Sequence, residues 1–473
     1  MSNNNERNKY FIKNTAIFAI GNMSTKLISF LLVPLYTYVL STSDYGTIDL
    51  VFTLCGILTP VVMCNIGESI KRFSLGHDAS NNEILTVAFI WIGIGIVLTT
   101  AISPLFKFYD AVSSYVIQMY IYILIYAINI VFTEYLRGKE KFISYTVCSV
   151  TTSLIIAVLN IVFLVVLKLG IQGYFLAYII AYSCSALLAF ILGKPYKVFK
   201  HWAFNKILFK EMSAFSIMLV PNSLFWWVIN SSDRIMVTSI LGAAANGLLT
   251  VAYKVPSLMT TLSSIVMQAW QYSAIKEKES SDKSEYSNKM FDVYIKFTSL
   301  LASFLIVAVK PMLSIYVAPE YYSAWQYSPF LIVGFMFLTL ATFVGTSYYV
   351  EKDMKGNLTS AFWGAIVNVA LNFILIYKVG IIGATVASCI SNIVIFAYRM
   401  ADTKKYLKLI ISKSGVINFC LVAMILAATY VPGKVTPFVQ GGIFVAQIVF
   451  NKKMIISLLK PILNIFSSIQ RSK

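Results

Sequence analysis

The residues of this chain that could do chemistry lie between positions 221 and 268, where charged side chains interrupt two apolar stretches. Asp233, Arg234 and Lys254 each lie about eight to ten residues from the glycine-containing turn at 242–246. If both stretches are membrane helices, these charges lie inside a hydrocarbon core that is about 30 Å thick. Charges at that depth are costly and usually face a cavity. The pattern therefore predicts a polar interior that could bind a charged molecule.

Helical periodicity arranges the neighbouring polar residues into two stripes. In the first stretch, Asn230 and Arg234 share one face, with Trp226 and Asp233 beside it. Two antiparallel helices could thus present one cation-bearing seam to a common space. The alternative is that these groups only satisfy one another in helix packing, although two cations cannot do so for each other. The stripe of the second stretch comprises Gly247, Thr250, Lys254, Ser257, Thr261, Ser264 and Gln268.

A further lysine lies deep in the first apolar stretch of the chain. Lys26 is about a dozen residues into it, on one helical face with Asn22 and Ser29. The deep charges are then the cations Lys26, Arg234 and Lys254 against the carboxylate of Asp233. Because surplus positive charge in an interior suits an anion, we expect these cations to bind an anionic substrate. The residues expected to line the same cavity are Asn22, Asn230, Asp233, Thr250, Ser257, Thr261 and Trp226.

Composition indicates that these elements lie in a membrane. Of the 473 residues, 58% are hydrophobic and only 12% are charged, which leaves little that could form a soluble domain. Pro34, Pro60, Pro221 and Pro256 each interrupt an apolar stretch. The stretches long enough to span a bilayer number about fourteen. They are residues 15–40, 47–70, 84–106, 114–136, 143–167, 171–193, 213–240, 247–270, 291–317, 326–350, 357–377, 380–400, 415–431 and 436–456.

The distribution of Lys and Arg predicts the orientation of these spans. Most of the 38 Lys and Arg residues fall in alternate loops and in the two terminal segments. Since such residues accumulate on the cytoplasmic side, both termini are expected in the cytoplasm. The net charge of +18 is explained by these loops, so the lipid bilayer is an expected partner and nucleic acid is not.

An internal repeat divides the chain. Residues 160–173 resemble residues 372–383, and Asp44 to Gly46 have a counterpart in Ala245 to Gly247. Six spans per half give both halves the same orientation, related by an axis along the membrane normal. The sequence thus predicts an all-α polytopic membrane protein with two six-helix lobes in pseudo-twofold relation plus two C-terminal helices. The expected divisions are an N-terminal lobe, a cytoplasmic linker, a C-terminal lobe, and two additional helices with a cytoplasmic tail, at 1–193, 194–210, 211–400 and 401–473.

The sequence shows no motif that is typical of catalysis or of cofactor binding. The six cysteines all fall inside apolar stretches and lack CxxC spacing, so they are interpreted as small hydrophobic residues. No spacing typical of zinc binding, nucleophilic catalysis or phosphate cradling occurs. We therefore expect no catalytic residue, no metal and no cofactor.

Several motifs together resemble a known family. They are FLLVPLYTYVLSTSDYGTIDL, EYLRGKEKFISY, SSDRIMVTSILGAAANGLLTVAYKVP, AWQYSAI, PEYYSAW, and the pair Asn368 and Asn372 before GIIGA. In these features, over residues 13–400, the chain resembles the polysaccharide flippases of the multidrug/oligosaccharidyl-lipid/polysaccharide exporter superfamily, and among them the bacterial O-antigen repeat-unit flippases.

The resemblance implies an alternating-access transporter of the bacterial inner membrane. Its substrate would be an undecaprenyl-diphosphate-linked oligosaccharide, moved from the cytoplasmic to the periplasmic leaflet, and other polysaccharide assembly proteins are further implied partners. Related flippases for peptidoglycan precursors have a cationic central cavity, to which Lys26, Arg234 and Lys254 would correspond here.

Two other functions remain open at this stage. A multidrug exporter of the same superfamily would favour carboxylates inside, for cationic drugs, whereas the deep charges here are mostly positive. A membrane polysaccharide polymerase or ligase would carry a long outer loop with catalytic polar residues, whereas the longest polar segment, about 273–290, is expected in the cytoplasm.

Overall fold

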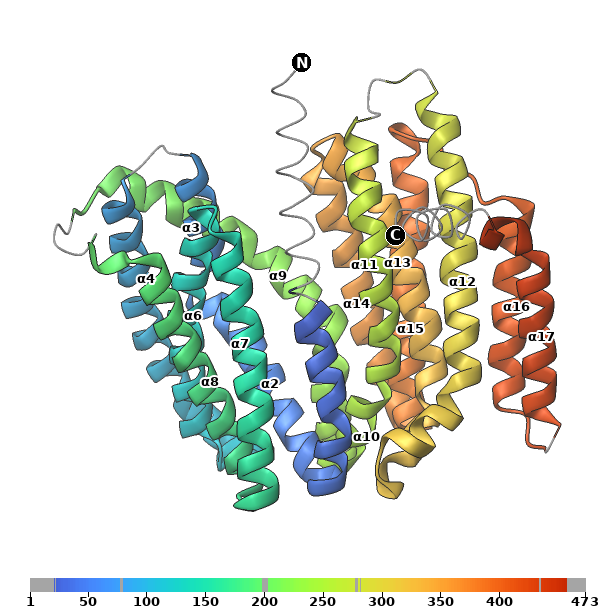
Figure 1. Ribbon diagram of the computed structural model, residues 1–473, viewed down its shortest axis with the longest axis horizontal. Coiled ribbons are helices and arrows are strands. Elements are labelled where there is room, and N and C mark those ends of the chain that lie inside the picture. Colours follow the sequence, from blue (N-terminus) through green and yellow to red (C-terminus); the bar gives the residue numbers. More distant parts are fainter. Residues whose placement is uncertain are drawn as a thin grey trace, which may run out of the picture. The chain divides into compact units, whose positions relative to one another are not determined.

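A computed structural model of the protein describes residues 21, 23–76, 80–197, 203–276, 280, 282–433 and 435–456. All regular elements in these ranges are helices (Figure 1). Contacts divide the chain into two compact units. Unit 1 is Met1–Val251 with Tyr316–Tyr321, and unit 2 is Ala252–Ile315 with Tyr322–Lys473. The lobe boundaries expected from the sequence rest on the internal repeat and stay a prediction.

The helices of unit 1 begin with one that has no label in Figure 1, Met23–Val39. The others are α2 (Thr42–Val62), α3 (Ile66–Gly76), α4 (Asn81–Ile102), η1 (Ser103–Phe108), α5 (Asp110–Ser113), α6 (Val116–Gly138), α7 (Phe142–Asn160), the π-helical η2 (Ile161–Val166), α8 (Gly170–Gly193), η3 (Pro195–Lys197), α9 (Lys206–Leu241) and α10 (Ala243–Ala252). Unit 2 contains α11 (Lys254–Lys276), α12 (Lys283–Tyr316) except its last residue, the second part of η4 (Pro319–Gln326), α13 (Ser328–Val350), α14 (Met354–Val379), α15 (Ile381–Asp402), η5 (Thr403–Lys405), α16 (Lys413–Thr429) and α17 (Thr436–Phe450).

The helices agree with the expected membrane spans. In the described part of the chain, 10 helices are long and apolar enough to cross a membrane, and three shorter apolar helices add Met23–Val39, α16 and α17. The expected span 247–270 is divided into α10 and α11. The predicted class, an all-α polytopic membrane protein with about fourteen spans, is therefore confirmed.

At two prolines, a backbone carbonyl loses its helical hydrogen bond, and a side-chain hydroxyl from elsewhere in the chain donates to it instead. Pro256 has no N–H to donate to the carbonyl of Ala252, and the Ser328 hydroxyl donates to that oxygen instead, at 3.0 Å. In unit 1, Pro34 leaves the carbonyl of Phe30 in the same way, and the Tyr316 hydroxyl donates to it. Because an unpaired carbonyl in hydrocarbon costs several kcal/mol, these hydroxyls make the proline positions tolerable.

Each unit has its own interior. In unit 1, the Phe52 ring lies against a group of aromatic rings, with centroids 4.9 Å from Tyr122 and 4.8 Å from Tyr178. In unit 2, Arg399 is only 3% exposed and ties three helices together. Its guanidinium donates to Ser360 and Asn357 of α14 and to a carbonyl of α13. Unit 2 therefore holds a buried cation through neutral acceptors, as a structural element.

Candidate functional site

An ion pair between α2 and α9 is the centre of the candidate site in unit 1. Arg234 Nη1 donates to Asp49 Oδ1 at 3.2 Å, and the two side chains are 23% and 13% exposed. Two further bonds hold α9 on α2 and on the turn between α2 and α3. Trp227 Nε1 donates to the carbonyl of Thr53 at 3.0 Å, and Asn65 Nδ2 donates to Ser223 Oγ at 3.0 Å. The guanidinium is thus fixed beside a carboxylate.

Asn246 of α10 connects to the same carboxylate. Its amide nitrogen donates to the carbonyl of Gly46 at 2.8 Å and lies 3.5 Å from Asp49 Oδ2. Asn246 itself is fully buried. Gly46 and Asp49 are three residues apart and therefore lie on the same face of α2. Elements α2, α9 and α10 therefore meet at one polar cluster, which we call the Asp49 cluster: Asp49, Arg234 and Asn246.

Two glycines allow this approach. A Cβ atom on Gly46 would lie 1.8 Å from the carbonyl oxygen of Ala243, and one on Gly247 would lie 2.0 Å from that of Thr42. Both distances are too short for any side chain, so the starts of α2 and α10 cross backbone to backbone, as small residues permit between membrane helices. The sequence repeat aligned these same positions, Gly46 with Gly247, and the structure packs them together.

The other predicted site residues of unit 1 differ in exposure. Asp233 is 1% exposed, and its Oδ1 accepts the backbone N–H of Arg234 at 2.9 Å. Thr250 is 2% exposed. Asn230 is exposed, with its amide donating to the carbonyl of Trp226, a half-buried residue, at 2.6 Å. Lys26 is exposed on the first helix. Asn22 lies outside the described residues.

The remaining predicted residues belong to α11 of unit 2. Lys254 is its first residue and is half-buried. The Ser257 hydroxyl donates to the Lys254 carbonyl at 2.6 Å, and the Thr261 hydroxyl donates to the Ser257 carbonyl at 2.9 Å. These hydroxyls donate to carbonyls of their own helix, so the polar stripe does not depend on hydrogen bonds from a partner helix. A seam shared by Lys254 and Arg234 stays a prediction.

Asp49 is the residue that sequence reasoning missed. The expected span begins at residue 47, which placed Asp49 at its edge and not among the deep charges. The spacing of the repeat could have found it, because Asp49 follows Gly46 by three positions as Thr250 follows Gly247. With Asp49 included, Arg234 has a counter-ion within its own unit.

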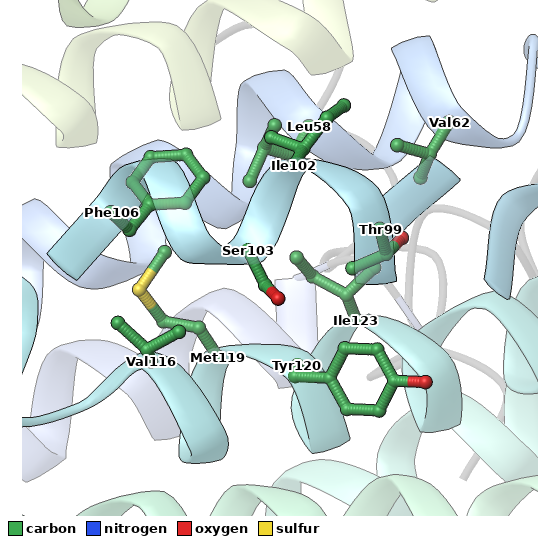
Figure 2. Close-up of a pocket in the computed structure, with 10 residues that line it drawn as sticks. All are labelled: Leu58, Val62, Thr99, Ile102, Ser103, Phe106, Val116, Met119, Tyr120 and Ile123. Atoms are coloured by element: carbon green, nitrogen blue, oxygen red, sulfur yellow. The ribbon is translucent and has the colours of Figure 1, made fainter. Parts of the chain in front are cut away.

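The polar cluster differs from the apolar pocket of the same unit (Figure 2). That pocket is a small, partly open space between α2, α4, η1 and α6, and its lining carries no charged side chain. Its lining is Leu58, Val62, Thr99, Ile102, Ser103, Phe106, Val116, Met119, Tyr120 and Ile123. Among the described residues, no group of three or more His, Cys, Asp or Glu side chains could hold a metal. The Asp49 cluster, in contrast, contains a half-buried cation, Arg234, which could attract an anion.

Comparison with solved structures shows the fold. The chain is similar to a lipid II flippase MurJ in an inward closed conformation, at 14% identity and a TM-score of 0.65, over 96% of this chain and 100% of that one. It is also similar to an inward-facing multidrug resistance MATE family transporter of the MOP superfamily, at 14% identity and a TM-score of 0.61, over 86% and 94%. A mutant of the Vibrio cholerae MATE transporter VcmN matches at 13% identity and a TM-score of 0.57, over 86% and 99%.

Comparison of sequences shows the family. No curated protein sequence matches the chain. A family model described as "Polysaccharide biosynthesis protein" matches residues 11–271, which include the whole Asp49 cluster. The chain therefore belongs to this polysaccharide biosynthesis protein family and has the fold of the MurJ and MATE transporters, as the resemblance in its sequence predicted.

Proposed function

We propose that the protein is a flippase that moves an undecaprenyl-diphosphate-linked oligosaccharide, such as an O-antigen repeat unit, from the cytoplasmic to the periplasmic leaflet by alternating access. The family and the transporter fold support a membrane transporter of polysaccharide assembly over a polymerase or ligase. The observation that carries the proposal is the presence of cations on membrane helices, with Arg234 held in a polar cluster. The protein would lie in the bacterial inner membrane with both termini in the cytoplasm.

The cations would act on the diphosphate. A diphosphate leaving water needs charged donors in place of its hydration, each worth about 1.5 to 3 kcal/mol. Lys26, Arg234 and Lys254 are the residues proposed to supply them. The residues proposed to line the path are Asn22, Asn230, Asp233, Thr250, Ser257, Thr261 and Trp226.

The membrane potential would drive export. The diphosphate carries about two negative charges outward across an inside-negative membrane, and each is worth about 2.3 kcal/mol per 100 mV. Several kcal/mol therefore favour outward movement if the charge crosses uncompensated. Transport in proteoliposomes should accelerate when an inside-negative potential is imposed, and indifference to that potential would contradict this coupling.

Substitution of Lys254 tests the site. Lys254→Ala should cripple flipping while the protein reaches the membrane at normal abundance, whereas Lys254→Arg should keep part of the activity because the charge survives with altered geometry. The measurements are the surface polysaccharide and the membrane protein level in the same cells. Normal polysaccharide from a normally expressed Lys254→Ala variant would remove this residue from the site. Lys26→Ala and Arg234→Ala should behave like Lys254→Ala.

A multidrug exporter is the second candidate, because Asp49 and Asp233 are carboxylates on the helices of unit 1 and the MATE transporters share the fold. Carboxylates would suit cationic drugs. Purified protein in liposomes distinguishes the two functions: a flippase moves the lipid-linked oligosaccharide and not a cationic dye, whereas an exporter does the reverse.

A further inference from the structure

Asp49 is positioned to act as the counter-ion of Arg234. Its Oδ1 accepts from the guanidinium at 3.2 Å, and its Oδ2 lies 3.5 Å from the amide nitrogen of Asn246. Both side chains keep part of their surface exposed, 13% for Asp49 and 23% for Arg234. The guanidinium is a planar fork of five donors, a geometry that suits an anion with several acceptor oxygens, such as a diphosphate.

Resting on the proposed function, we infer that Asp49 holds Arg234 between transport events and gives it up to the diphosphate of the substrate. Binding then becomes an exchange of one anion for another on the same cation. A monovalent anion gains little by displacing a carboxylate of equal charge that is already in position. A diphosphate carries about two charges and can gain contacts that Asp49 does not make. Asp49 is thus a specificity-determining residue that also helps release the substrate.

Asp233 does not fit this role, although it is adjacent in sequence. It is 1% exposed, and its Oδ1 is occupied by the backbone N–H of Arg234 within the same helix. Asp49 comes from a different helix, α2, so a small shift of α9 against α2 separates the pair. Relative movement of two helices is the kind of change that alternating access requires.

Inorganic pyrophosphate is the probe for this competition. Its affinity for the full-length protein in detergent is measured by calorimetry at fixed ionic strength. Asp49→Asn should bind pyrophosphate about tenfold more tightly than the wild type, since the competing charge is gone and charged hydrogen bonds are worth at least that factor. Arg234→Gln should lose most of the binding. Asp44→Asn is the matched control, because it removes the same charge from the same helix, outside the Asp49 cluster, and it should leave the affinity within about twofold.

Transport kinetics give a second measurement. Flipping of the lipid-linked oligosaccharide by Asp49→Asn should show a lower KM together with a lower kcat, because the substrate is held more tightly and leaves more slowly. Asp49→Glu should restore part of the wild-type kcat. A residue that only stabilises the fold would not lower KM. If Asp49→Asn is not monodisperse by gel filtration, Asp49→Ser is used in its place in both assays, because it removes the same charge.

The outcomes separate this inference from the proposed function. Pyrophosphate binding that depends on Arg234 but is unchanged or weakened in Asp49→Asn would overturn the role of Asp49 and leave the anion site standing. Binding that is the same in wild type and Arg234→Gln would overturn the anion site and the competition together.

Discussion

Replacing Gly46 by alanine should separate α2 from α10 and disrupt the Asp49 cluster. The added Cβ would lie 1.8 Å from the carbonyl oxygen of Ala243 and 2.7 Å from the backbone nitrogen of Gly247. Both neighbours are backbone atoms, so no side chain can rotate away. The helices must move apart by roughly 1 Å or more, because overlaps of this size are not absorbed in a packed interior. The hydrogen bond from Asn246 to the carbonyl of Gly46, 2.8 Å long, is lost or stretched.

The expected loss of stability follows from these two effects. Overpacking costs about 1 to 3 kcal/mol, and one buried hydrogen bond adds about 1 kcal/mol. Gly46→Ala should therefore lose about 2 to 4 kcal/mol. Gly93 of α4 is the matched control, since a Cβ there meets nothing within 4 Å. Gly93→Ala should gain about 0.5 to 1 kcal/mol, because alanine loses less backbone freedom in a helix.

Thermal unfolding in detergent, followed by fluorescence-detected gel filtration, measures the difference. The midpoint of Gly46→Ala should fall by about 5 °C or more, and that of Gly93→Ala should stay or rise. Pyrophosphate affinity should change only in Gly46→Ala, because only that substitution moves Asn246 and Asp49. Equal midpoints for the two variants would refute the close backbone crossing of α2 and α10.

The remaining predictions concern unit 2 and the topology. Ser328→Ala leaves the carbonyl of Ala252 unpaired and should cost about 1 to 3 kcal/mol, whereas Ser314→Ala, at an exposed position, should cost less than about 0.5 kcal/mol; equal midpoints would contradict the capping of this carbonyl. The pKa of Asp353, the N-cap of α14, is held below its usual range by the backbone N–H of Gly356 and by hydrogen bonds from Lys405 and Tyr406. That stability is present above the unfolded pKa of about 3.9 and is lost as pH falls through the folded value, so the deficit of Asp353→Ala, about 1 kcal/mol at pH 7, should shrink below about pH 4. A deficit independent of pH would contradict a charged cap. Single cysteines in a cysteine-free protein should label from outside with an impermeant reagent at three positions but not at two others, and outside labelling at residue 280 would overturn the topology. The three are Ser43, Ala244 and Pro432, and the two are Ser280 and Ser412.

Hydrophobicity was enough to predict the helices, because a span must satisfy its own backbone in lipid. The division between α10 and α11 was harder to place. Pro256 marks an interrupted span, but the chain can tolerate the break because of Ser328, which is distant in sequence. Asp49 was missed for a similar reason. Its position at the edge of an apolar stretch gives no sign of depth. The spacing of the repeat pointed to it, but the contact with Arg234 is what identifies its role in the site. In both cases, a contact between helices distant in sequence supplies the information that the local sequence lacks.

Asp49 compensates the charge of Arg234, but an anionic substrate is still favoured. A guanidinium within a membrane span needs an anion close by, because the cost of leaving it without one is several kcal/mol. Asp49 provides that anion for Arg234 within unit 1. Lys26 is exposed on its helix and Lys254 is half-buried, so an ammonium at either position can keep part of its hydration. In the inferred exchange, Arg234 becomes available to the substrate only when Asp49 is displaced. A substrate with one charge would not displace Asp49 from Arg234, whereas a diphosphate would compete for the guanidinium.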